Sequence, residues 1–251
     1  MAVGPWVAFL ACAGLAEVIG AMAGFGAATV FTPLAMLFLD AKAAIVVVAV
    51  FHLFGTGSRL LFFGRHIHWR IWAQFGLTGV FCSFLGAHIA ARLPSAAVEL
   101  LFGGFLLLYV AGDLLVPGRL RLSAGPLTLM GGGAISGVVA GLLGTGGAVR
   151  AVCLLAFDLP QAVYLGTSAA LALIVDATRL PVYLAEGLLP PAMGPVLISL
   201  APVACAGAWI GQRLVRRLSV VGFHRFVLIL LALMGLKLAV TGSHRLLVPG
   251  G

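Results

Sequence analysis

Residues 137–183, with the sequence GVVAGLLGTGGAVRAVCLLAFDLPQAVYLGTSAALALIVDATRLPVY, contain the features that decide the fold. An apolar helix begins here and breaks at residues 144–147 (GTGG), in a stretch otherwise suited to lipid. The chain turns at Leu159-Pro160 and crosses again with Asp176 and Arg179 inside an apolar run. A glycine break and opposite charges at membrane depth are costly, and they usually occur where a polar solute is handled. The stretch therefore predicts a membrane protein that handles a polar solute.

The composition agrees with this prediction and excludes other classes of protein. Of the 251 residues, 62% are hydrophobic and 9% are charged, whereas an ordinary soluble domain has about 25% charged residues. Several apolar runs exceed the roughly 20 residues that a membrane-spanning helix needs, and none alternates with the period of a barrel strand. The net charge of +8 comes from basic residues at the ends of these runs. That placement indicates topology signals and no nucleic-acid partner. We expect an all-α polytopic membrane protein.

The cysteines give no indication of a metal, a disulfide or a cofactor. Cys12, Cys82, Cys153 and Cys205 stand alone on apolar segments, without CxxC or Cys/His ligand spacing. We therefore interpret them as small core residues.

The first half of the chain carries a weaker copy of the opening stretch. Gly24 and Gly26 precede Gly144 and Gly146 by 120 positions, and Arg59 precedes Arg179 by the same interval. Residues 86–93 also align with residues 207–214. A duplication of this length is typical of a transporter built from two similar halves. We predict repeats over residues 1–121 and 122–251.

The orientation of the two repeats has two solutions. If all eight apolar segments cross the membrane, both halves face the same way and the basic residues scatter over both sides. If the broken segments 5–39 and 124–157 are re-entrant hairpins, each half has three further crossings and the second half is inverted. The second solution gathers most basic loop residues on one side: Arg65, Arg70, Arg119, Arg121, Arg213, Arg216 and Arg217. The positive-inside rule favours it and makes that side cytoplasmic.

The glycine breaks are the first candidate site. A helix that restarts inside the membrane leaves backbone N–H groups without partners, and glycines allow close approach, so the pair of breaks predicts an anion site. The alternative is close helix packing, because glycine is common in transmembrane helices. The substrate-binding candidates at the breaks are Gly24, Gly26, Gly144, Thr145, Gly146 and Gly147.

Polar residues on the spans that follow the breaks form the second candidate site. His52, Thr56 and Arg59 are spaced to lie on one face of a helix, and the repeat has Asp176 and Arg179 at the positions of Thr56 and Arg59. Each arginine lies about 10 Å past the middle of its span. It can contact an anion or extend outward to the headgroups, and the sequence leaves both options open.

Proton coupling and hydroxyl ligands complete the list of candidates. Asp176 either pairs with Arg179 or couples protons, and His52 either changes charge near neutral pH or is bonded within the bundle. Glu17 has no counterpart in the second half and is a third proton candidate. Thr167 and Ser168 supply hydroxyl groups near the start of their span.

At these residues the chain resembles the sulfite exporter TauE/SafE family of bacterial inner-membrane permeases. The resemblance rests on the first break with the downstream Pro33, on residues 141–147, on Leu159-Pro160 followed by residues 166–168 (GTS), and on the duplicated layout. The first break departs from the family, whose members usually have more glycines there. The resemblance implies transport of small sulfur-containing anions such as sulfite, sulfonates or sulfoacetate.

We therefore predict a secondary transporter, not an enzyme, that moves such an anion by alternating access, with proton coupling as an option. An anion channel is the first alternative. An intramembrane hydrolase that uses Ser168 and His52 is less favoured. The expected partners are a small anion and the lipid bilayer, and the sequence leaves a homodimer open.

Overall fold

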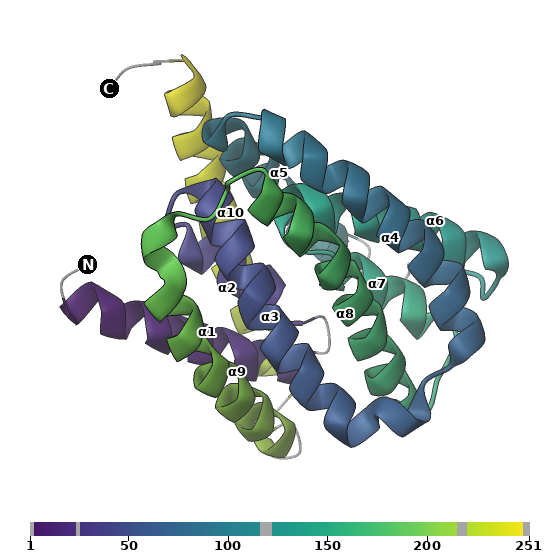
Figure 1. The fold of residues 1–251 in the computed structure, drawn as a ribbon. Helices are drawn as coiled ribbons and strands as arrows, with labels where there is room; N and C mark the ends of the chain where they lie inside the picture. Colours follow the sequence, from purple (N-terminus) through teal and green to yellow (C-terminus); the bar gives the residue numbers. More distant parts are fainter. Residues whose placement is uncertain (1–2, 24–25, 116–121, 215–219, 248–251) are drawn as a thin grey trace.

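The computed structural model describes residues 3–23, 26–115, 122–214 and 220–247, and this part of the chain is helical without any strand (Figure 1). Eight of the described helices are long and apolar enough to cross a bilayer, which confirms the predicted polytopic all-α class. They are α1 (Val3–Ala23), α3 (Ala41–Phe63), α4 (Trp69–Arg92), α5 (Ser95–Leu115), α6 (Pro126–Leu143), α8 (Gln161–Ala185), α9 (Gly194–Leu214) and α10 (Val220–Leu247).

Two short helices, α2 (Ala28–Ala35) and α7 (Gly147–Leu155), follow the two expected breaks. Gly144 ends α6 in the left-handed conformation with φ +79°, and its N–H donates to Ala140 O at 2.9 Å. Gly26 has φ +90° at the first break. Glycine adopts such backbone angles without the clash that a Cβ would cause. Both breaks are thus confirmed as interruptions of helical structure, while Gly24 lies outside the described residues.

Helices at equivalent positions of the two predicted repeats pack against each other in opposite directions. On α3 and α8, His52 contacts Asp176, and His68, which follows α3, donates its backbone N–H to Thr167 near the start of α8. The two helices are therefore antiparallel, and Figure 1 shows them side by side. The helices α5 and α10 are also antiparallel neighbours.

The remaining large contacts join one predicted repeat to the other. The helix α1 packs along α9, where a Cβ on Gly207 would lie 2.8 Å from Cβ of Glu17. Likewise α6 packs along α4, where a Cβ on Gly137 would overlap the backbone of Gly79. The first helix of each broken segment, α1 or α6, thus packs against a helix of the other half. Antiparallel pairing of equivalent helices is what inverted repeats require, and the orientation of the repeats in a membrane stays a prediction.

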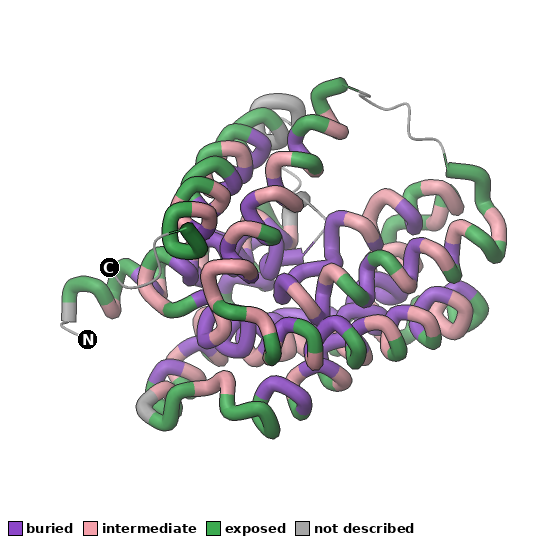
Figure 2. The backbone as a smooth tube through the Cα atoms, turned by 90° about the horizontal axis from the view of Figure 1, so that it is seen from above, coloured by how far each residue is buried: buried purple, intermediate pink, exposed green. Residues whose placement is uncertain are grey.

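Polar contacts tie helices together at one end of the bundle. At one end Ser95 donates to Asp40 Oδ2 at 2.7 Å, and Arg245 Nη1 donates to Glu99 Oε1 at 2.7 Å. Between the ends, buried residues follow the inward faces of the helices and exposed residues follow the outward faces (Figure 2). Large apolar side chains such as Leu61 and Leu127 lie on the outside, as expected for a surface that faces lipid tails. Of the arginines predicted for the cytoplasmic side, Arg119, Arg121, Arg216 and Arg217 lie outside the described residues.

We expect the glycines of α6 that face α4 to set the stability of the bundle. A methyl group on Gly137 has no space because the backbones of α4 and α6 touch there, whereas a methyl group on Gly131 meets nothing within 4 Å. Overpacking of this kind costs roughly 1–3 kcal/mol. Gly137→Ala should therefore lower the thermal unfolding midpoint of the protein in detergent, and Gly131→Ala, on the same helix, should not. Equal midpoints for the two variants would contradict the close packing.

Candidate functional site

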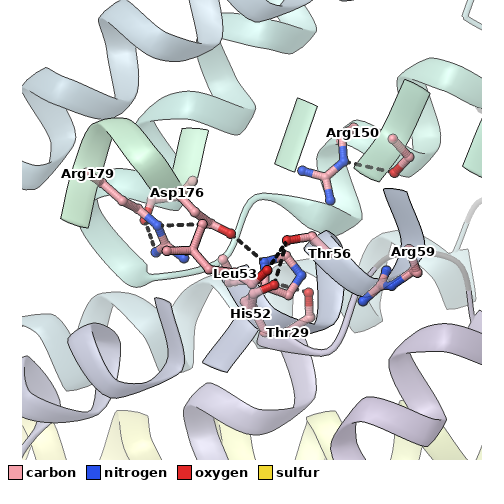
Figure 3. A network of polar contacts seen from close by, with 12 residues as sticks. Thr29, His52, Leu53, Thr56, Arg59, Arg150, Asp176 and Arg179 are labelled. Carbon is pink, nitrogen blue, oxygen red and sulfur yellow. Dashed lines mark hydrogen bonds and ion pairs between the residues drawn. The ribbon is translucent and has the colours of Figure 1, made fainter. Parts of the chain in front are cut away.

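A buried charge network joins α3 to α8 in the middle of the bundle (Figure 3). Asp176 accepts at Oδ2 from Nδ1 of His52 at 2.7 Å, and at Oδ1 from Nε of Arg179 at 2.9 Å. All three side chains are buried. The expected pairing of Asp176 with Arg179 is present, and His52 belongs to the same network. Asp176 therefore uses both oxygens as an acceptor between two basic groups.

Arg179 and Tyr183 connect this network to the second break. Arg179 Nη1 donates to Ala140 O at 2.8 Å, and the Tyr183 hydroxyl donates to Gly141 O at 2.5 Å. Both carbonyl groups belong to the last turn of α6, and Ala140 O also accepts from the N–H of Gly144. The two side chains hold the end of α6 against α8. Arg179 is 1% exposed, so it does not extend to the headgroups.

Arg59 occupies a different environment from its equivalent in the second half. Its Nη2 donates to Oε1 of Glu17 at 2.7 Å, and both residues are buried. Arg59 therefore does not extend to the headgroups either, and its partner is a carboxylate of its own chain. The neighbouring Thr56 donates its hydroxyl to His52 O at 2.6 Å, which is a contact within its own helix.

Arg150 on α7 is a functional candidate that sequence reasoning missed. It is 5% exposed, and its Nε donates to Oγ of Ser168 at 3.1 Å. It also lies close enough to Asp176, Arg59 and Arg179 to interact with their charges. The available signal was an arginine three residues after the second break, inside an apolar run, because such residues at membrane depth are usually functional.

A small cavity of about 10 Å³ lies where the breaks meet the charge network. This is room for about one water molecule. Its wall comes from both broken segments and from α3 and α8: Ala28, His52, Ala140, Gly144, Thr145, Gly146, Gly147, Arg150, Ala172, Val175, Asp176 and Arg179. The hydroxyl groups of Thr29 and Thr145 are 2.7 Å apart and join the two breaks, and Ser136 donates to Gly146 O at 2.9 Å.

The second nitrogen of His52 is directed into this region without a partner. Among the described residues, Nε2 of His52 is buried and makes no hydrogen bond. A Cβ on Gly26 would lie 3.0 Å from that nitrogen and 3.7 Å from Nη2 of Arg150. The two nitrogens therefore lie within hydrogen-bonding range of a common position beside the first break. One oxyanion placed there could accept from the guanidinium of Arg150, and from Nε2 of His52 when the ring is cationic.

The family follows from a comparison with known protein families. The profile described as sulfite exporter TauE/SafE matches residues 9–238, which is most of the chain. The chain belongs to the sulfite exporter TauE/SafE family. Membership confirms the resemblance, and it implies that this TauE/SafE protein is a polytopic membrane transporter of a sulfite-type anion. No curated protein and no solved structure matches the chain.

The structure brings some predicted site residues of this TauE/SafE protein together and places others elsewhere. Thr167 accepts from the backbone N–H of His68 at 2.9 Å and fastens the loop after α3 to α8. Ser168 reaches the site only through Arg150. Thr56, Arg59 and Glu17 are not among the described residues that line the cavity. Those that do line it are His52, Gly144, Thr145, Gly146, Gly147, Asp176 and Arg179.

The charges around the cavity favour an anion. Two guanidinium groups, of Arg150 and Arg179, and one carboxylate, of Asp176, line the described wall. The wall thus carries net positive charge even when His52 is neutral. Asp176 already neutralises Arg179 through a direct ion pair at 2.7 Å. Arg150, in contrast, donates to the hydroxyl of Ser168, and no carboxylate of the described residues is bonded to it.

Proposed function

We propose that the protein is a secondary transporter in a bacterial inner membrane that binds a small sulfur oxyanion between its two helix breaks. The proposal rests on one observation above all: Nε2 of His52 is buried without a partner beside the guanidinium of Arg150. Buried polar atoms nearly always have a hydrogen-bond partner. When the His52 ring is cationic, Nε2 and the guanidinium form a donor pair directed at one position, which suits an oxyanion with several acceptor oxygens.

The breaks supply the remaining ligands of the proposed site. The helix α7 begins at Gly147 without a side-chain cap, and Gly146 and Gly147 line the cavity. Uncapped N–H groups in the first turn of a helix favour negative charge. The Thr29 and Thr145 hydroxyls lie beside them, and because one donates to the other, the pair has one hydroxyl hydrogen left for a ligand. The site thus offers two kinds of basic side chain, hydroxyls and backbone N–H groups to one anion.

The size of the cavity supports alternating access. A cavity with room for about one water molecule is too small for an anion with three oxygens around a sulfur atom. In the proposed cycle this structure is a closed state, and the helices around the breaks separate before the anion enters. In broken-helix transporters such movement of one half against the other exposes the site to each side in turn. The antiparallel α3 and α8 pair supports inverted halves for this motion.

His52 is the better proton carrier of the candidates around the cavity. Its Nδ1 faces an acceptor oxygen of Asp176, so Nδ1 carries the hydrogen and Nε2 has one only when the ring is cationic. An oxyanion needs a donor at Nε2, and binding should therefore take up one proton. Asp176 is held by Arg179 and His52 together, and its role is to fix the ring and its tautomer.

Transport measurements in proteoliposomes test the proposal. We expect saturable uptake of ³⁵S-sulfite that exceeds uptake by protein-free liposomes and increases when the outside is more acidic than the inside. Unlabelled sulfoacetate and taurine as competitors would define the class of anion. Flux above roughly 10⁵ ions per second would indicate a channel, because conformational cycles occur on microsecond or longer timescales. Absence of flux for all three anions would overturn the proposal.

Gly26→Ala should strongly reduce this uptake. The added methyl group would occupy the space beside Nε2 of His52 and Nη2 of Arg150, and φ of +90° strains any residue with a Cβ. Strain of this kind costs of order 1–3 kcal/mol, and the methyl group also displaces the anion. We expect a loss of roughly tenfold or more in kcat/KM. Gly57→Ala is the matched control, since a Cβ there meets nothing within 4 Å; equal losses in both variants would contradict the position of the site.

A further inference from the structure

The ion pair between Glu17 and Arg59 is less completely bonded than the other arginine pair of the site. Within the described structure, Oε2 of Glu17 and Nε of Arg59 are buried and have no hydrogen-bond partner. Arg179, in contrast, donates to Asp176 and to Ala140 O and has no buried unpartnered atom. A purely structural buried ion pair needs its remaining donors and acceptors satisfied to offset desolvation. The Glu17–Arg59 pair does not meet this condition.

The surroundings of Glu17 leave space for its carboxylate to lie against α3. A Cβ on Gly55 would lie 2.7 Å from both carboxylate oxygens of Glu17, and Gly55 is one helical turn before Arg59. On the α9 side, Gly207 lies against the Cβ of Glu17. The carboxylate therefore occupies a glycine-lined space beside the guanidinium. An oxyanion ligand of Arg59 would need the same space.

The position of Arg59 connects this space to the cavity. Arg59 is seven residues beyond His52 on α3, a distance of about 10 Å along the helix, toward the end where His68 contacts Thr167. Its charge interacts with that of Arg150, and Figure 3 shows both arginines on the same side of the network. Arg59 thus lies between the cavity and one end of the bundle.

We propose that Arg59 is a second oxyanion subsite, which the carboxylate of Glu17 occupies when no transported anion is present. The inference rests on the proposed function and adds to it that Glu17 competes with the transported anion for Arg59. An anion that leaves the cavity toward the His68 end displaces Glu17 from Arg59 and takes over its contact. The Arg179 end lacks such a labile pair, so this subsite belongs to one side of the membrane only.

The affinity for sulfite in Glu17→Gln tests this proposal. The neutral amide is a weaker competitor for Arg59, and the apparent affinity rises as the competent fraction of the protein rises. We expect KM for ³⁵S-sulfite in proteoliposomes to fall roughly fivefold or more, and Glu17→Asp, whose shorter side chain reaches Arg59 poorly, to change KM in the same direction. Glu99→Gln is the matched control, because Glu99 is also buried, bonded to an arginine and left with one unpartnered oxygen. Glu99 lies at the end of the bundle, and we expect KM for sulfite in Glu99→Gln to equal that of the unmodified protein.

Three results would contradict the subsite. If Glu17→Gln and Glu17→Asp lower the thermal unfolding midpoint but leave KM unchanged, the pair is structural only. If Glu99→Gln lowers KM as much as Glu17→Gln, the effect is not specific to Arg59. If Arg59→Gln retains the affinity of Glu17→Gln, the anion does not bind Arg59. Failure of the proposed function has a separate signature, which is the absence of sulfite flux in the unmodified protein.

Discussion

Arg150→Gln is expected to reduce sulfite uptake to near the level of protein-free liposomes while the protein remains folded. Two arginines line the described cavity wall, and Arg150 is the one whose guanidinium has no carboxylate bonded to it. Its charge is therefore available to the substrate. Loss of one partner of a buried, hydrogen-bonded charge pair costs about 2–5 kcal/mol. That corresponds to roughly a 30-fold or greater loss of kcat/KM. Arg150→Lys should recover only part of the activity, since an ammonium group lacks the planar fork of donors.

Arg213→Gln is the matched control for this prediction. Arg213 lies in the last turn of α9, where it is exposed and its guanidinium stacks 3.6 Å from the ring centre of Trp209. The substitution removes the same charge and leaves the cavity unchanged. Uptake should stay within about twofold of the unmodified protein. Retained uptake in Arg150→Gln, or an equal loss in Arg213→Gln, would remove Arg150 from the site.

Asp176→Asn should have the largest effect on stability. Both oxygens of Asp176 accept hydrogen bonds from basic groups in a buried environment, and the amide leaves Arg179 without a counter-ion. Breaking a buried ion pair costs about 3–5 kcal/mol. We expect a clear decrease in the thermal unfolding midpoint in detergent, together with loss of uptake because the ring of His52 loses its fixed orientation.

Glu186→Gln, at the C-terminal end of the same helix, serves as the control. Glu186 is exposed and follows α8 at its C-terminal end, where the charge contributes little. Its unfolding midpoint and uptake should match those of the unmodified protein. If Asp176→Asn unfolds at the same temperature as Glu186→Gln, the network between α3 and α8 does not stabilise the bundle.

Local sequence patterns predicted the helices, the breaks and the polar stripes. Apolar run length and glycine placement identify a membrane helix and its interruption without knowledge of the fold. The spacing of His52, Thr56 and Arg59 likewise fixes one helix face, and the structure buries all three. These features depend on residues close together in the chain.

The partners of those residues could not be predicted in the same way. His52 finds Asp176 in the other half of the chain, and Arg59 finds Glu17 on another helix. No periodicity encodes such pairings, which depend on how the halves pack. Arg150 was not predicted as a site residue, because its partner Ser168 lies on another helix and their contact depends on packing. The prediction that Arg59 contacts an anion or the headgroups did not include a carboxylate as its partner.

The packing of α1 and α6 against helices of the opposite half has a consequence for the assembly of the protein. The helix α1 is synthesised well before its packing partner α9. Until then, the glycine-lined groove beside Glu17 has no second wall, and only Arg59 can neutralise the carboxylate. Contacts between residues so far apart in the chain form late and slow the final assembly. We therefore expect α1 to complete its packing only after α9 has been inserted, and a chain stopped before α9 to lack one wall of the space around Glu17.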